Sequence, residues 1–306
     1  MKRSAIILIM SLILLSGCAD RTKLGGRAII QAAAVDYNNG YRVSALMFSG
    51  GGSGGDIDAS QENVIKVVGE GETLAEAIDS ISLADGKRLY MCETKLLILG
   101  EGFEEISAME TLRTLYFDMR CGLNMPVCYA KNAEALTDLH FTEGITSAEK
   151  PLSMIENANE MGVSPKTTLL DLLAENEGGE MTIIPCFEIV ENGSSTTRSE
   201  DGDDGDSKTA LLCGSRLIRS GKLLDSYNQA QTVGLLLRTG QTDKLMMNYK
   251  LGEAERSCEA YGIKIRTDGG RLTVSAKFRT RQGDALSEEE RRAALNALTK
   301  IVEDSL

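Results

Sequence analysis

The stretch VIKVVGEGETLAEAIDSIS, residues 64–82, contains signals for a strand, a tight turn and a helix in direct succession. Its apolar first part ends at Gly69 and Gly71, and Thr73 with Glu76 then forms a capping box at the start of a helix. The apolar residues that follow recur at helical spacing and define one face of that helix: Leu74, Ala77, Ile78 and Ile81. The stretch therefore predicts a helix packed onto a sheet directly after a glycine turn.

Strands and helices alternate on both sides of this stretch. Upstream, AIIQAAAVDY and YRVSALMF flank Asn38-Asn39-Gly40, whose Asn-Gly pair is a strong turn signal, so we predict a hairpin. Downstream, the pattern predicts a strand at 95–101, a helix at about 104–116, a strand at 125–130 and a helix capped by Asn132. The alternation predicts an α+β fold with several mixed β-sheets, each flanked by helices.

The chain of 306 residues is long enough for two or three domains. We expect an N-terminal α/β domain at 18–140, a middle domain at 141–245 and a partial C-terminal domain at 246–306. The middle domain includes the acidic segment 191–208, which is typical of a solvated, disordered loop.

The last of these domains is expected to be small. Asp268-Gly269-Gly270 predicts a hairpin turn, and Ser287 with Glu290 caps a helix. Because two strands are seldom stable without a third strand or a packing partner, this unit is expected to pack on the preceding domain or to be completed by a partner subunit. The edge of its hairpin is the surface that most favours strand addition.

The N-terminus has the pattern of an export signal. Lys2 and Arg3 precede an apolar run at 5–15, which is shorter than the roughly 20 residues that a membrane-spanning helix needs. The following Leu-Ser-Gly-Cys at 15–18 has the pattern of a bacterial lipobox. We therefore predict a signal peptide at 1–17 and a diacylglyceryl group on Cys18; the alternative is an ordinary signal with a chance cysteine.

Charge disfavours one class of partner. Cleavage before Cys18 leaves 31 basic and 45 acidic residues, a net charge of −14 with the single histidine neutral. Such a surface repels phosphates and anionic head groups, so nucleic-acid binding is disfavoured. Attachment to a membrane is expected to come from the lipid on Cys18 rather than from a basic patch.

Signals for catalysis, cofactors and metals are missing from the sequence. His140 is the only histidine, and no G-x-S-x-G elbow is present to pair with it. The glycine-rich segment 49–56 lacks the lysine of a P-loop, and the aspartates at 201–206 lack the glycine and glutamate of an EF-hand. We expect no enzyme activity, no cofactor and no metal site. Glu70 and Glu72 make the turn at 69–77 structural rather than phosphate-binding.

Six cysteines remain beyond Cys18, and an exported protein can pair them. Cys186 and Cys213 lie within apolar runs, where a free thiol behaves as a small hydrophobic group. Unpaired thiols are favoured, with disulfides as the alternative, for all six: Cys92, Cys121, Cys128, Cys186, Cys213 and Cys258.

The order of several motifs resembles that of the spore germination Ger(x)C lipoproteins. The lipobox, the hairpin, the pattern of Gly69, Gly71, Thr73 and Ala77, and LYMCETKLLILGE at 89–101 follow one another as in that family. Later matches are TTLLDLL at 167–173, Pro185, and a segment from Gly214 to Leu224. The family usually carries a tryptophan after the lipidated cysteine, whereas Ala19 stands here and the chain contains no tryptophan.

The resemblance implies a function and a set of partners. Members of the family are C subunits of germinant receptors, needed for nutrient-triggered germination and held by their lipid on the outer face of the inner spore membrane. It implies polytopic A-type and B-type partner subunits, a non-enzymatic scaffold role, and a shortened C-terminal domain, because family members continue with a further helix and strands. An exported solute-binding lipoprotein is the alternative function.

Overall fold

The computed structural model describes residues 27–48, 64–139, 148–178, 181–191, 208–268 and 271–304. The predictions for Cys18, His140, the glycine-rich segment and the aspartates at 201–206 lie outside these ranges. No helix in the described part of the chain has the length and apolar character needed to cross a bilayer.

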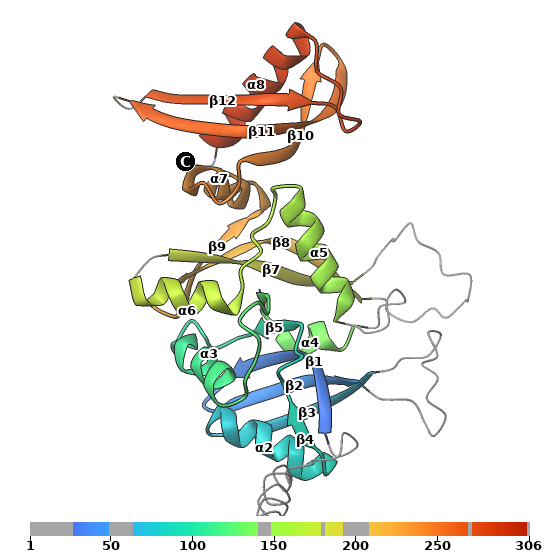
Figure 1. Cartoon of the computed structure of the whole chain (residues 1–306), viewed down its shortest axis with the longest axis vertical. Coiled ribbons are helices and arrows are strands. Elements are labelled where there is room, and N and C mark those ends of the chain that lie inside the picture. The colour runs from blue at the N-terminus through green and yellow to red at the C-terminus, as the bar shows by residue number, and fades with distance from the viewer. Residues whose placement is uncertain are drawn as a thin grey trace, which may run out of the picture.

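Nine strands of the described residues form one large mixed sheet, in the order β3-β2-β1-β5-β6-β7-β8-β9, with β4 paired to β1 (Figure 1). In the centre, β1, β5, β6 and β7 run parallel, and the strands on either side are antiparallel to their neighbours. Their bounds are β1 (Arg27–Tyr37), β2 (Tyr41–Phe48), β3 (Val64–Gly71), β4 (Arg88–Tyr90), β5 (Leu96–Leu99), β6 (Val127–Ala130), β7 (Met181–Glu191), β8 (Lys208–Arg219) and β9 (Lys222–Asn228).

Helices cover both faces of this sheet. Alternate strand residues face opposite sides, so Ala33 and Leu97 lie in one core while Ala32 and Leu96 lie in the other. The first core is covered by α2 (Leu74–Asp85), α3 (Ala108–Phe117) and α6 (Leu169–Gly178). The second is covered by α4 (Ala133–Thr137) and α5 (Glu149–Glu160). Burial on both faces explains why the central strands are continuously apolar.

The turn between β3 and α2 has the predicted form. The hydroxyl of Thr73 accepts a hydrogen bond from the amide of Glu76 at 3.2 Å, and the Glu76 carboxylate accepts one from the amide of Thr73 at 3.3 Å. Ala77 is fully buried beneath the strand. A side chain at Gly69 or Gly71 would overlap the backbone of α2 at Ala77, and neither glycine has a positive φ. Both positions therefore require glycine because the helix and the strand approach closely, and not because the backbone is left-handed.

The C-terminal part forms a second, smaller sheet in the order β10-β11-β12, drawn in orange at the top of Figure 1. Its elements are α7 (Gln229–Thr239), β10 (Lys244–Leu251), β11 (Ala254–Asp268), β12 (Arg271–Arg279) and α8 (Glu288–Glu303). The predicted hairpin is β11 and β12, and the predicted cap of α8 at Ser287 and Glu290 is present. The expectation of two strands with one helix was incomplete, because β10 adds a third strand and α7 contributes Val233 and Leu237 to the same core.

The α+β class with mixed sheets flanked by helices is confirmed. The expected domain boundaries do not coincide with the edges of these sheets. Strands β6 and β7 pair across the boundary placed at 140/141, and the boundary placed at 245/246 falls within β10. Pairing between distant segments produced this arrangement, and local sequence pattern carries no signal for it.

Candidate functional site

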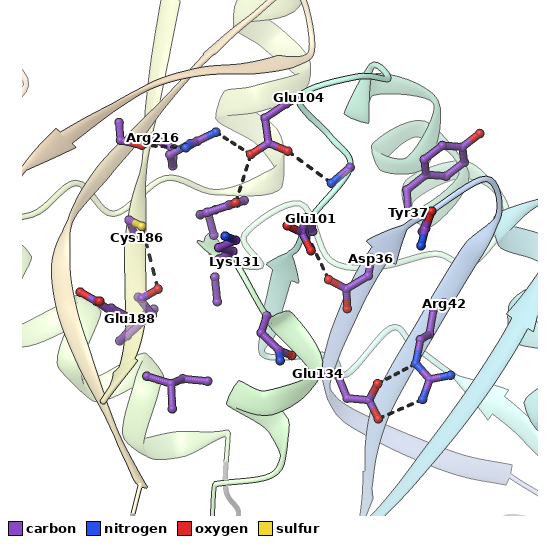
Figure 2. A pocket seen from close by; sticks show the side chains of 18 of the residues that line it. Asp36, Tyr37, Arg42, Glu101, Glu104, Lys131, Glu134, Cys186, Glu188 and Arg216 are labelled. Atoms are coloured by element: carbon purple, nitrogen blue, oxygen red, sulfur yellow. Dashed lines mark hydrogen bonds and ion pairs between the residues drawn. The ribbon is translucent and has the colours of Figure 1, made fainter. Parts of the chain in front are cut away.

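An open groove lies where the parallel strands β1, β5, β6 and β7 end. Because these strands run in one direction, their carboxyl ends meet at the same edge of the sheet, the usual place for ligands in open α/β sheets. Its volume is about 1350 Å³. Each strand contributes polar groups at this edge: Asp36 and Tyr37 from β1, Glu101 after β5, Lys131 after β6 and Glu188 from β7 (Figure 2).

Asp36 joins three elements at the base of the groove. Its carboxylate accepts a hydrogen bond from the amide of Glu101 at 3.1 Å, and others from the amides of Ala133 and Glu134 at the start of α4. Burial raises the pKa of Asp36, and these three hydrogen bonds offset part of that rise. A side chain at Gly100 would overlap the Asp36 carboxylate. The role of the Asp36 carboxylate is thus to bind backbone amides and hold them in place.

A network of ion pairs forms one wall of the groove. Glu134 on α4 accepts hydrogen bonds from Arg42 Nε at 2.6 Å and from Lys66 Nζ at 2.8 Å, and these two side chains also pair with Glu70 and Asp138. The hydrogen bond from Arg42 is the main reason that the pKa of Glu134 falls to about 2. The network ties α4 to strands β2 and β3.

A second polar contact joins the loop after β5 to strand β8. Glu104 Oε1 accepts hydrogen bonds from Arg216 Nη2 at 2.7 Å and from the Tyr129 hydroxyl at 3.1 Å, as Figure 2 shows for Glu104 and Arg216. The Arg216 guanidinium also lies 4.7 Å from the centre of the Tyr129 ring, a cation–π distance. Burial raises the pKa of Tyr129, so its hydroxyl remains a donor.

The cationic side chains of the groove differ in whether they have ion-pair partners. Its two arginines, Arg42 and Arg216, are both held in ion pairs. Lys131 is exposed and has no ion-pair partner among the described residues. Within the described ranges, no three side chains of His, Cys, Asp or Glu gather closely enough to hold a metal ion.

The predicted glycine turn and Gly214 do not line this groove, whereas Asn132, Cys186 and Cys213 do. Gly69, Gly71, Thr73 and Ala77 form the turn from β3 to α2, and their role is local packing. Gly214 lies in β8 beside the groove, with a φ of 147° and no room for a side chain because the carbonyl oxygen of Tyr227 occupies that space.

The groove itself was not predicted. A usable signal was nevertheless present, because each of three predicted strands is closed by a charged residue: Asp36, Glu101 and Lys131. Their meeting at one edge depends on β1, β5 and β6 being parallel neighbours, which the alternation of elements alone does not establish.

Comparison with known proteins places this chain among spore germination proteins. A family described as "Spore germination protein N-terminal domain" matches residues 20–189. Spore germination protein KC of Bacillus subtilis (strain 168) is 30% identical over 105 residues, which make up 32% of this chain but only 25% of that protein. The crystal structure of the GerBC protein aligns with 89% of this chain, and the alignment spans 78% of the GerBC chain. The sequence identity is 17% and the TM-score is 0.44.

Proposed function

Because the chain belongs to the Ger(x)C family of spore germination proteins, we propose that it is a non-enzymatic lipoprotein subunit of a germinant receptor. In this role it is needed for nutrient-triggered germination and acts as a scaffold for other subunits. The observation that carries the proposal is the family match over residues 20–189, which begins two residues after the lipobox cysteine Cys18.

The proposed anchor is the lipid on Cys18, and the proposed place is the outer face of the inner spore membrane. The strongly acidic chain has little electrostatic attraction for anionic head groups, so acyl chains supply the attachment. A single chain binds only marginally, whereas the several chains of a lipoprotein hold durably. The proposed partners are polytopic A-type and B-type receptor subunits.

The geometry of the groove supports a role without catalysis. The charged groups Asp36, Glu134 and Arg216 each bind other parts of the protein, which leaves them engaged in structure rather than in proton transfer. A scaffold subunit requires such a rigid framework.

Deletion of the gene tests the function. Spores that lack this chain should lose their response to a nutrient germinant and retain their response to a trigger that bypasses nutrients. The chain purified from spore membranes should also bring down two multi-span proteins. A normal nutrient response in the deletion strain, over every nutrient to which the parent responds, would refute the proposal.

The alternative, an exported solute-binding lipoprotein, is favoured by one observation, the groove of about 1350 Å³ at the edge of the sheet. This alternative predicts that small solutes raise the melting temperature of the isolated protein and that transport ATPase genes lie beside its gene. Genes for two multi-span proteins beside it would favour the receptor subunit.

A further inference from the structure

Two thiols lie side by side in the wall of the groove. Cys186 is on β7 and Cys213 is on the neighbouring antiparallel strand β8, where Cys186 pairs directly with Gly214. Both side chains are half-buried and both line the groove, where Figure 2 shows Cys186 between Arg216 and Glu188. The thiol of Cys213 donates a hydrogen bond to the carbonyl oxygen of Cys186, with 3.2 Å between sulfur and oxygen.

A β-bulge places Cys213 beside Cys186. The register of β7 and β8 shifts between Cys186 and Phe187, so that Cys213 is the extra residue of β8, between Leu212 and Gly214. In a regular ladder, successive side chains point to opposite faces, whereas a bulge turns a side chain out of that alternation. Gly214, which has a positive φ and no space for a side chain, allows this bend.

The two thiols have different chemical character. A hydrogen bond with the Cys186 thiol lowers the pKa of Cys213, because the S–H group of Cys186 stabilises a thiolate on Cys213. The same hydrogen bond, followed by burial, raises the pKa of Cys186, and the nearby guanidinium of Arg216 opposes this rise. Cys213 therefore forms a thiolate more readily and attacks first, which leaves Cys186 as the neighbouring thiol that can resolve the mixed disulfide.

We propose that Cys186 and Cys213 are a thiol–disulfide couple, a modification site in the groove wall that reacts with low-molecular-weight disulfides. In the first step, the Cys213 thiolate attacks one sulfur of the small disulfide, which forms a mixed disulfide and releases one small thiolate. In the second step, Cys186 loses its proton to solvent and attacks the sulfur of Cys213. The second small thiolate leaves, so that two protein thiols are oxidised and one small disulfide is reduced to two thiols.

Of the four other cysteines in the described residues, Cys92 is half-buried but does not line the groove, and the remaining three are buried. Cys128 and Cys258 are fully buried, and burial raises the pKa of both thiols. Cys121 is also buried, with a pKa raised to about 12, chiefly by that burial. These thiols lack the lowered pKa and the access to the groove that Cys213 has.

The test uses the full chain carrying Cys18→Ser, in which six cysteines remain, with oxidised glutathione as the small disulfide. After incubation of the folded protein, free thiols are alkylated in denaturant and unreduced peptides are mapped by mass spectrometry. We expect the loss of two of the six alkylatable thiols and a linked pair of peptides that contain Cys186 and Cys213.

Three variants separate the roles of the thiols. Cys186→Ser should trap glutathione on Cys213, because the resolving thiol is gone, and Cys213→Ser should leave Cys186 unmodified. Cys128→Ser, on the neighbouring strand β6, is the matched control and should give the same linked peptides as its parent. The protein without these three substitutions is itself a test. If Cys186 and Cys213 both stay fully alkylatable, or if either forms a disulfide with another cysteine, the proposal is overturned. Faster trapping by Cys186 than by Cys213 would overturn the assigned roles.

Discussion

At the scale of the residue, glycines determine how closely the elements of this protein approach one another, because they have no side chain. Gly69 and Gly71 let α2 lie directly against β3, and Gly100 makes room for the Asp36 carboxylate. At these three positions the neighbouring atoms would overlap an added methyl group, so the cost of substitution is steric and arises in the folded state.

A substitution at the first of these glycines measures that cost. Gly69→Ala should lower the free energy of unfolding by about 1–3 kcal/mol, because the added carbon has to displace the backbone of α2. Gly122→Ala is the control, since an added carbon there meets nothing closer than 4.0 Å, and should change stability by less than about 0.5 kcal/mol. Urea denaturation provides both values, and equal stabilities for the two variants would contradict the packing argument.

The proposed anchor also depends on a single residue. Cys18→Ala removes the thiol that the lipobox presents, so the variant should stay unlipidated and appear either as a released protein or as an uncleaved precursor. Fractionation of spore lysates followed by a high-salt wash measures this. A variant that is processed normally and remains with the membrane would place the tether elsewhere.

At the scale of the element, α4 shows how a helix that is too short to be stable alone is held in place. It spans Ala133–Thr137, and isolated helices of that length are not stable in water. Asn132 caps its first turn by accepting the amide of Ala135 at 2.9 Å, and Asp36 accepts further amides of the same turn. Glu134 then fixes the helix to β2 and β3 through Arg42 and Lys66.

The pH dependence of stability tests the role of Glu134. Its pKa in the folded protein, about 2, lies below the ordinary value of 4.5, so its ion pairs stabilise the fold above pH 4.5 and are lost as pH falls towards 2. Glu134→Gln should lower stability at neutral pH by on the order of 1 kcal/mol, since Arg42 is partly exposed, and should flatten the loss of stability on acidification.

Glu156→Gln is the matched control for this measurement, because its partner Lys166 forms an exposed pair on the surface. Such pairs contribute about 0–1 kcal/mol, so little change is expected. Denaturation curves recorded from neutral to acidic pH compare the two variants. If Glu134→Gln loses stability on acidification as steeply as the unsubstituted protein, Glu134 does not contribute to the acid sensitivity of the fold.

At the scale of the whole molecule, helix α7 packs against two sheets that have separate cores. Leu236 of α7 packs with Ile183 and Leu217 of the large sheet, while Val233 and Leu237 of the same helix pack in the core of the small one. The small sheet has β12 at one edge, paired on one side with β11. Apart from a bridge between Arg279 and Ala285, the other side of β12 pairs with no strand of the described residues, so its backbone groups are suited to strand addition.

Hydrogen exchange tests whether a partner subunit docks at that edge. Amides of β12 that point away from β11 should exchange faster in the isolated protein than in the assembled receptor, because a docked strand would hydrogen-bond them. The amides of β11, which lies between β10 and β12, serve as the internal control and should be protected in both states. Equal, strong protection of β12 in both states would show that the edge is closed without help.

The sequence by itself determined the local features of this protein. The capping boxes at Thr73 and Ser287, the hairpin turn at Asn38-Asn39-Gly40 and the apolar face of α2 were all predicted correctly. Each of these features is produced by residues a few positions apart, and the spacing alone places the interacting groups together. The order of such motifs was also sufficient to indicate the family.

Only the tertiary structure decided what brings distant residues together. The groove requires β1, β5 and β6 to be parallel neighbours, and the large sheet continues across the boundary expected at 140/141. Cys186 and Cys213 are in contact because a bulge shifts the register of two long strands. Pairing and register depend on long-range contacts whose free energy is shared over whole strands, so no short stretch of sequence encodes them.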